Sequence, residues 1–233
     1  MSLFSDAGML FLLRWVHFLA GVTWIGLLYY FNFVQGPFFA EADAATKSSA
    51  TQKLVPRALW WFRWGAMVTF LSGIAILGMR QASWNDGWGM TILTGAAFGT
   101  IMFLNVWLVI WPNQKVVIAS AVAAASGGQA NPKAAPSARR AFLASRTNVV
   151  MSFPMLFFMG AASHFTLDAS HNAGRFGLVL LVVLVALEAN ALMGTTGPTK
   201  KPIETVRGVI VTGFVTTAVM YALAQAVLGS AAM

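Results

Sequence analysis

The sequence predicts an all-α integral membrane bundle of about six transmembrane helices, forming a single domain over residues 1–233. Hydrophobic residues make up 58% of the chain and charged residues 9%, whereas a soluble domain carries about 25% charged residues. The apolar residues gather in six segments long enough to cross a bilayer, which needs roughly 20 residues. Lys and Arg fall between these segments, so the net charge of +8 reflects topology and anionic headgroups and does not indicate nucleic acid binding.

We expect the spans at about 9–35, 59–80, 89–112, 141–164, 173–194 and 204–228. The first (FLLRWVHFLAGVTWIGLLYYF) is long enough to tilt, and the Gly36-Pro37 pair indicates its end. The third ends near Trp111-Pro112, where the indole is typical of the headgroup level. The connection of about 113–140 is rich in Ala, Ser, Gly and Pro. Its first part is expected to continue the third helix into the cytoplasm, and the rest is typical of a flexible linker.

The distribution of positive charge predicts the orientation. The connections after the first, third and fifth spans hold most of the basic residues, namely Lys47, Lys53, Arg57, Arg63, Lys115, Lys133, Arg139, Arg140, Lys200, Lys201 and Arg207. The opposite side has only Arg80 and Arg175. Because Lys and Arg favour cytoplasmic loops, both termini are expected on the periplasmic side of a bacterial inner membrane.

Two histidines lie in apolar spans, His17 in the first and His164 at the end of the fourth. An ionisable side chain at membrane depth costs free energy unless it is paired or bound, so each is a candidate functional residue. The first span runs inward and the fourth runs outward. Both rings are therefore expected in the outer half of the bilayer, at depths that let them face one planar ligand.

The neighbours of these histidines favour a haem. Residues four apart share a helix face, so Gly21 and Gly160 each lie one turn deeper than a histidine and leave room for a flat macrocycle. Arg14, one turn nearer the outer surface than His17, is suited to pair with haem propionates. Apolar walls are expected from the aromatic residues nearby, which are Trp24, Trp15, Phe18, Phe157, Phe158 and Phe165.

These positions predict one b-type haem with His17 and His164 as the axial ligands of its iron. The residues alone leave two alternatives open. In the first, each histidine makes an interhelical hydrogen bond and the glycines serve helix packing. In the second, the pair binds another metal or a substrate. The chain has no cysteine, which excludes disulfides, thiolate metal sites, iron–sulfur clusters and covalent c-type haem. The third histidine, His171, is expected at the surface in the short outer loop.

Other polar residues at depth have simpler interpretations. Glu188, about six residues from the inner end of the fifth span, is expected to form an ion pair with Arg63 or Arg146. A proton-relay role is the alternative. The asparagines in the spans are typical of interhelical hydrogen bonding, and they are Asn32, Asn105, Asn148 and Asn190.

Four segments carry a family resemblance: LRWVHFLAGVTWIGLLYYFNF, WWFRWGAMVTFLSGIAIL, GTIMFLNVWLVIWPNQK and SRTNVVMSFPMLFFMGAASHF. Together they resemble the membrane domain of the bacterial membrane-anchored, cytochrome-c-linked urate oxidase (urate hydroxylase) family, over roughly residues 10–165. The resemblance implies a haem-bearing membrane scaffold, oxidation of urate towards 5-hydroxyisourate and electron transfer to cytochrome c. His17 and His164 fall on the family's histidines in the first and last segments.

The sequence also departs from the family's pattern. It has no Cys-x-x-Cys-His motif, so the electron acceptor is expected to be a separate protein. It is shorter than the family's membrane domain, and it lacks spans between the second and third segments. Histidines expected in full-length members are replaced in the stretch Ser145–Asn148 and in the third span, which has Thr91 and Thr94. The resemblance therefore favours the haem scaffold over urate chemistry.

The leading hypothesis is a membrane haem b protein that transfers electrons to or from a separate c-type cytochrome or a larger respiratory complex. One alternative is a urate-oxidising enzyme that uses a separate cytochrome c. Another is a non-catalytic membrane subunit or small transporter with structural histidines. The sequence leaves open whether the chain is itself an oxidoreductase, and whether it assembles with copies of itself or with other subunits.

Overall fold

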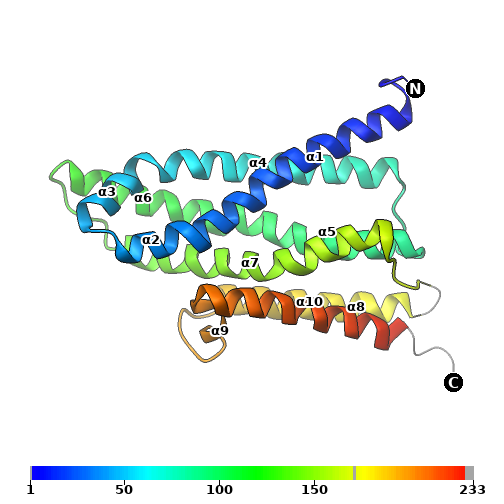
Figure 1. Cartoon of the computed structure of the whole chain (residues 1–233). Helices are drawn as coiled ribbons and strands as arrows, with labels where there is room; N and C mark the ends of the chain where they lie inside the picture. The colour runs from blue at the N-terminus through cyan, green and yellow to red at the C-terminus, as the bar shows by residue number, and fades with distance from the viewer. Residues whose placement is uncertain (1, 170–171, 229–233) are drawn as a thin grey trace.

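The computed structural model describes residues 2–169 and 172–228, and in those residues every regular element is a helix. Six helices are long and apolar enough to cross a membrane, which makes the chain a multi-pass membrane protein. The start of α1 and the end of α10 lie at the same end of the bundle (Figure 1). The charge distribution predicts that this end faces the periplasm. We call it the outer end and the opposite one the inner end.

The first span is one continuous helix of 36 residues, made of α1 (Asp6–Tyr29), the π-helical segment η1 (Tyr30–Gln35) and α2 (Gly36–Glu41). The sequence predicts an end at Gly36-Pro37, but the helix continues through both residues. Pro37 stands at the start of α2, where its missing N–H is tolerated. The wider π turn before it relieves the crowding that a proline ring causes in a regular helix.

The second span is α4 (Val55–Met79), and a short helix at the inner end, α3 (Ala44–Lys53), leads into it. Asp43 caps α3 because its carboxylate accepts hydrogen bonds from the Ala45 and Thr46 backbone N–H groups, each at 2.9 Å. The inner half of α1 packs on α4 and crosses it at an angle, and the N-terminal end of α1 projects away from the bundle (Figure 1).

The third span is a continuous helix of 39 residues, made of α5 (Gly87–Leu104), the π-helical segment η2 (Asn105–Ile110) and α6 (Trp111–Ala125). At 1.5 Å per residue it is about 58 Å long, well beyond the roughly 30 Å of the hydrocarbon core. It therefore extends past the membrane at the inner end. The next helix begins at Ala134, so much of the predicted 113–140 linker is helical.

Helix α7 (Ala134–His164) is the central element of the bundle. It contacts α1, α5, α6, α8 and α10, and two thirds of its most apolar stretch is buried. Small and polar residues on α7 let the neighbouring backbones approach closely. Those buried residues are Ala141, Ala144, Thr147, Asn148, Ser152, Ala161 and Ala162.

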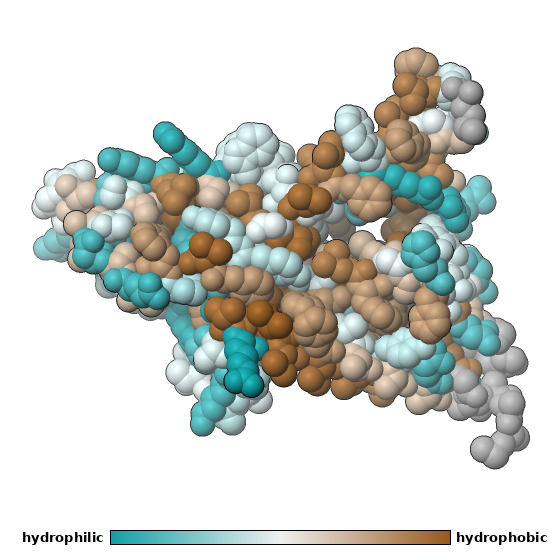
Figure 2. Space-filling view, in the orientation of Figure 1, coloured by the Kyte–Doolittle hydropathy of each residue, from teal (hydrophilic) through white to brown (hydrophobic). Residues whose placement is uncertain are grey.

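The last two spans, α8 (Ala173–Leu192) and α10 (Val206–Leu228), lie side by side against α7 (Figure 1). The single turn α9 (Lys201–Glu204) joins them at the inner end. Figure 2 shows hydrophobic residues over the middle of the bundle and hydrophilic residues gathered mainly at its two ends. This distribution is the one a lipid-embedded bundle requires.

We predict opposite effects from adding a methyl group at two glycines. A Cβ on Gly95 would lie 3.0 Å from the Met155 carbonyl oxygen and from the Met159 backbone nitrogen of α7. Gly95→Ala should therefore lower the free energy of unfolding by about 1–3 kcal/mol. A Cβ on Gly26 of α1 meets nothing within 4 Å. Gly26→Ala should leave stability unchanged or raise it by up to about 1 kcal/mol, because Ala favours helix.

Unfolding transitions of the two variants in detergent test this prediction. Equal stability of Gly95→Ala and Gly26→Ala would contradict the close approach of α5 to α7.

Candidate functional site

His17 lies on the side of α1 that packs against α4. Its Nδ1 is 3.1 Å from Ser72 Oγ, and that hydroxyl donates to the Val68 carbonyl oxygen at 2.6 Å. With the Ser72 hydroxyl hydrogen used there, the tautomer that fits both contacts carries its hydrogen on His17 Nδ1, which donates to Ser72 Oγ. The lone pair of the neutral ring is then on Nε2. A Cβ on Gly73 would lie 3.2 Å from His17 Cε1, so the glycine lets the ring pack closely against α4.

His164 is the last residue of α7 and is exposed. Gly160, one turn deeper, is also exposed, and a Cβ there would meet no atom within 4 Å. Phe157 and Phe165 pack on Tyr221 of α10, with ring centroids 5.9 and 5.7 Å apart. At the outer end of α7, the exposed imidazole of His164 therefore lies one turn outward of the open space at Gly160 and next to the rings that pack on Tyr221.

The two histidines are equally far along their helices from one interhelical contact. Tyr29 Oη of α1 hydrogen-bonds Ser152 Oγ of α7 at 2.8 Å, which fixes a contact between two antiparallel helices. His17 is twelve residues before Tyr29 and His164 is twelve residues after Ser152, so each is about 18 Å from this contact along its own helix axis, toward the outer end.

The rings nevertheless point in different directions. Twelve residues of helix turn a side chain by about 120°, so His17 faces α4 while Tyr29 faces α7. In residues 2–169 and 172–228 no hydrogen bond joins the two histidines. The structure therefore brings His17 together with Ser72 and Gly73, and it leaves His164 on a separate face.

The other predicted site residues divide in the same way. Gly21 and Trp24 lie with His17 against α4, where a Cβ on Gly21 would be 3.9 Å from Thr69 Cγ2. Trp24 is 2% exposed, and its indole Nε1 has no hydrogen-bond partner in the part of the chain that the structure describes. Arg14 is exposed, one turn further out. The third histidine, His171, lies outside the described residues.

Sequence reasoning missed Ser72, although it is the partner that orients His17. The available signal was the pair Ser72-Gly73 in an otherwise apolar span, LSGIAIL. A serine inside a span commonly bonds its own helix backbone, so nothing in the sequence pointed to His17 in particular.

A second polar group lies near the inner end, between η2, α7 and α8. Asn105 Nδ2 donates to Asn148 Oδ1 and to Glu188 Oε2, each at 2.9 Å. Asn148 Nδ2 donates to the Met102 carbonyl oxygen, also at 2.9 Å. Asn105 and Asn148 are 1% and 0% exposed. The predicted interhelical role of these asparagines is confirmed, and the π-helical segment η2 begins at Asn105, where the regular helix pattern is interrupted.

The ion pair predicted for Glu188 is wrong. Its partner is Asn105, and both candidate arginines stack on aromatic rings instead. The guanidinium of Arg63 lies 3.9 Å from the centroid of Trp111, and that of Arg146 lies 5.0 Å from Phe142. A delocalised guanidinium gains from an aromatic face and is weakly hydrated, so it needs a carboxylate less than an ammonium does.

At the inner end, α7 holds the connection between α8 and α10. Arg139 donates to both carboxylate oxygens of Glu204 and to the Thr195 carbonyl oxygen. The Arg139 hydrogen bond holds the pKa of Glu204 below its usual value. Lys200 is 3% exposed and donates to Asn190 Oδ1 and the Met193 carbonyl oxygen, at 3.0 and 3.2 Å. Burial, and secondly the charge of Arg139, lower the pKa of Lys200.

Comparison with known proteins gives one match. The model of a family described as "Urate oxidase N-terminal" matches residues 79–222. The matched stretch runs from the last residue of α4 into α10 and contains His164, Asn105, Asn148 and Glu188, but not His17. No curated protein and no solved structure matches the chain.

We predict that Asn148→Ala lowers the free energy of unfolding by about 0.6 kcal/mol for each interhelical hydrogen bond lost, and by at most about 1.7 kcal/mol for each, the average and the maximum measured for such bonds in membranes. The variant leaves Asn105 and the Met102 carbonyl group without a partner. Asn113→Ala is the control, because Asn113 bonds only the Val109 carbonyl oxygen of its own continuous helix. Thermal unfolding in detergent measures both, and equal losses would contradict a linking role for Asn148.

Proposed function

The chain belongs to the urate oxidase N-terminal family, and from this premise we propose that it is a membrane haem b protein of the bacterial inner membrane. It exchanges electrons with a separate c-type cytochrome or a larger respiratory complex. His17 and His164 would hold one haem in the outer half of the bilayer.

The hydrogen bond between His17 and Ser72 is the observation that carries this proposal. A metal-ligating histidine usually donates its other ring N–H to an acceptor, which fixes the tautomer and orients the ring. His17 has this arrangement, with Nδ1 on Ser72 Oγ at 3.1 Å and the Nε2 lone pair left for a metal. Bound haem would supply reversible one-electron transfer between ferric and ferrous iron.

The remaining donor set is suited to the same group. His164 offers a second imidazole toward the same outer end, and Gly160 has open space beside it. Arg14 is one turn outward of His17, where it can pair with propionates. The buried Trp24 indole has an N–H without an acceptor in the described residues, below the level of His17.

The two ligands are not equally constrained. His17 is held by Ser72 and by its close contact with Gly73. His164 ends α7 and precedes the non-helical stretch from Phe165 to Asp168. His164 is therefore the less constrained of the two proposed ligands, and the two imidazoles would have to reorient to share one iron.

Two other functions each have one observation in their favour. The family match favours a urate-oxidising enzyme that passes electrons to a separate cytochrome c. Reduction of cytochrome c on addition of urate distinguishes that enzyme from an electron carrier. The His17–Ser72 hydrogen bond also suits a purely structural histidine in a non-catalytic subunit or small transporter. An optical spectrum distinguishes that function from the first two.

We predict that the purified protein, produced with sufficient haem, has a sharp reduced α-band in dithionite-minus-oxidised spectra. His17→Ala and His164→Ala should each abolish the band, because each removes one axial ligand. His171→Ala, the remaining histidine of the chain, is the matched control and should keep it. A haem-free wild-type protein, or a band that survives both ligand variants, would exclude the proposal.

We predict that Ser72→Ala keeps the haem but raises its midpoint potential. Without the Ser72 hydroxyl, Nδ1–H keeps only its weaker contact with the Thr69 backbone, so the imidazole is a weaker base and stabilises ferric iron less. Thr69→Val is the control, because among the described residues the Thr69 hydroxyl bonds only the Gly65 carbonyl oxygen within α4. Redox titration monitored at the α-band measures the shift, and a potential equal to that of the control would remove the orienting role of Ser72.

A further inference from the structure

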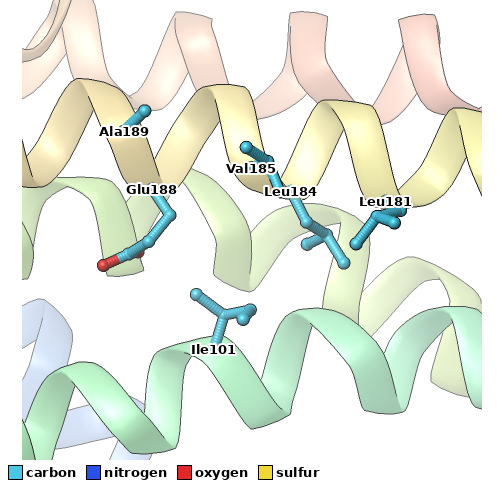
Figure 3. Close-up of a pocket in the computed structure, with 6 residues that line it drawn as sticks. All are labelled: Ile101, Leu181, Leu184, Val185, Glu188 and Ala189. Atoms are coloured by element: carbon cyan, nitrogen blue, oxygen red, sulfur yellow. The ribbon is translucent and has the colours of Figure 1, made fainter.

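Glu188 lines a cleft of about 260 Å³ between α5 and α8. The other lining residues are all apolar, namely Ile101, Leu181, Leu184, Val185 and Ala189. Figure 3 shows Glu188, Leu184 and Leu181 projecting from α8 toward the helix that carries Ile101. The cleft therefore has one carboxyl group at one end and hydrocarbon along the rest of its length.

The direction of the hydrogen bonds fixes which carboxyl oxygen is available. The Met102 carbonyl group can only accept, so Asn148 must donate to it and present its own oxygen to Asn105. Asn105 then donates to Asn148 and, with its second N–H, to Glu188 Oε2. Oε2 is thus an acceptor, and a proton on this carboxyl group resides on Oε1. Oε1 accepts no hydrogen bond from the residues that the structure describes.

The cations nearest in the fold are directed elsewhere. The stretch Gly87–Ile110, which faces Glu188, contains no charged residue and no histidine. On α7, Arg140 donates to the Leu192 carbonyl oxygen and Arg146 stacks on Phe142. Lys200 donates to Asn190 and Met193. On α10, Arg207 lies in the first turn at the inner end. Glu188 forms no salt bridge in the described ranges.

A carboxylate in hydrocarbon with a single amide donor is costly unless a cation pairs with it. Glu188 is four residues, or about 6 Å, from the inner end of α8, and Leu181 is about 10 Å further toward the middle of the membrane. The charged end of the cleft is therefore near the inner interface and the apolar end is near the bilayer centre. A single-chain amphiphile in the inner leaflet has the same orientation.

We propose that this cleft is a binding site for single-chain cationic amphiphiles of the alkylammonium type. The ammonium group pairs with Glu188 Oε1, and the alkyl chain lies along Leu184, Leu181 and Ile101. On binding, the O–H bond of the Glu188 carboxyl group breaks and its proton passes to water at the inner interface. The site exchanges one proton for one organic cation, and it is independent of the haem proposal.

The test uses the full chain in phosphatidylcholine nanodiscs. Dicyclohexylcarbodiimide, a lipid-soluble reagent for protonated carboxyl groups, should label Glu188, as measured by peptide mass spectrometry. Decylammonium should slow this labelling by about tenfold or more, which corresponds to about 1.4 kcal/mol. Decanol and decyl sulfate have the same alkyl chain as decylammonium but no positive charge, so they should not slow the labelling. Protection should weaken as the pH falls, because binding requires release of the proton.

Two variants and one control complete the test. Glu188→Gln should lose both the label and the thermal stabilisation by decylammonium. If that variant fails to fold, Leu184→Trp fills the cleft, and it should keep Glu188 labelling but lose protection. Glu204→Gln, whose carboxylate is paired with Arg139, should behave as wild type. Absence of labelling, equal protection by decanol, or undiminished protection in Leu184→Trp would overturn the proposal.

Discussion

Polar groups in the hydrocarbon core must find hydrogen-bond partners inside the protein, and helix α7 supplies such partners to its neighbours. The arrangement of the bundle depends on these hydrogen bonds. On α7, Ser152 is hydrogen-bonded to Tyr29, and Ser145 accepts a hydrogen bond from Asn32. Asn148 accepts a hydrogen bond from Asn105. These bonds connect α7 to the first and third spans. Each contributes only about a kilocalorie per mole, but their directionality fixes which faces of the helices meet.

All three hydrogen bonds lie in the middle or inner part of the bundle. The inner end and the outer end are therefore held together differently. Toward the inner end the helices are tied together through buried amides and through the Arg139–Glu204 pair. Toward the outer end the N-terminal end of α1 projects away from the bundle (Figure 1). Open space beside Gly160 is compatible with a bound cofactor at the outer end, whereas the inner network holds Glu188 in one orientation.

The sequence was sufficient to predict the helical membrane fold, because the length of an apolar segment reports directly on spanning. It also identified Asn105 and Asn148 as interhelical contacts. It predicted that the third helix continues beyond Pro112, but it did not reveal that the first span continues through Pro37, because the π-helical segment that accommodates this proline has no sequence signature. It assigned Glu188 to an arginine because charge pairing was weighed without knowing which helix faces meet. The rotation of His17 toward Ser72 was inaccessible for the same reason, since hydropathy gives depth but not direction.

Electron paramagnetic resonance of the oxidised, purified protein tests the central claim most directly, because two axial imidazoles give ferric haem a low-spin signal. The low-spin signal is expected in the wild-type protein and should be lost in His17→Ala. A high-spin signal, or no haem signal from protein produced with sufficient haem, would contradict ligation of one iron by both imidazoles.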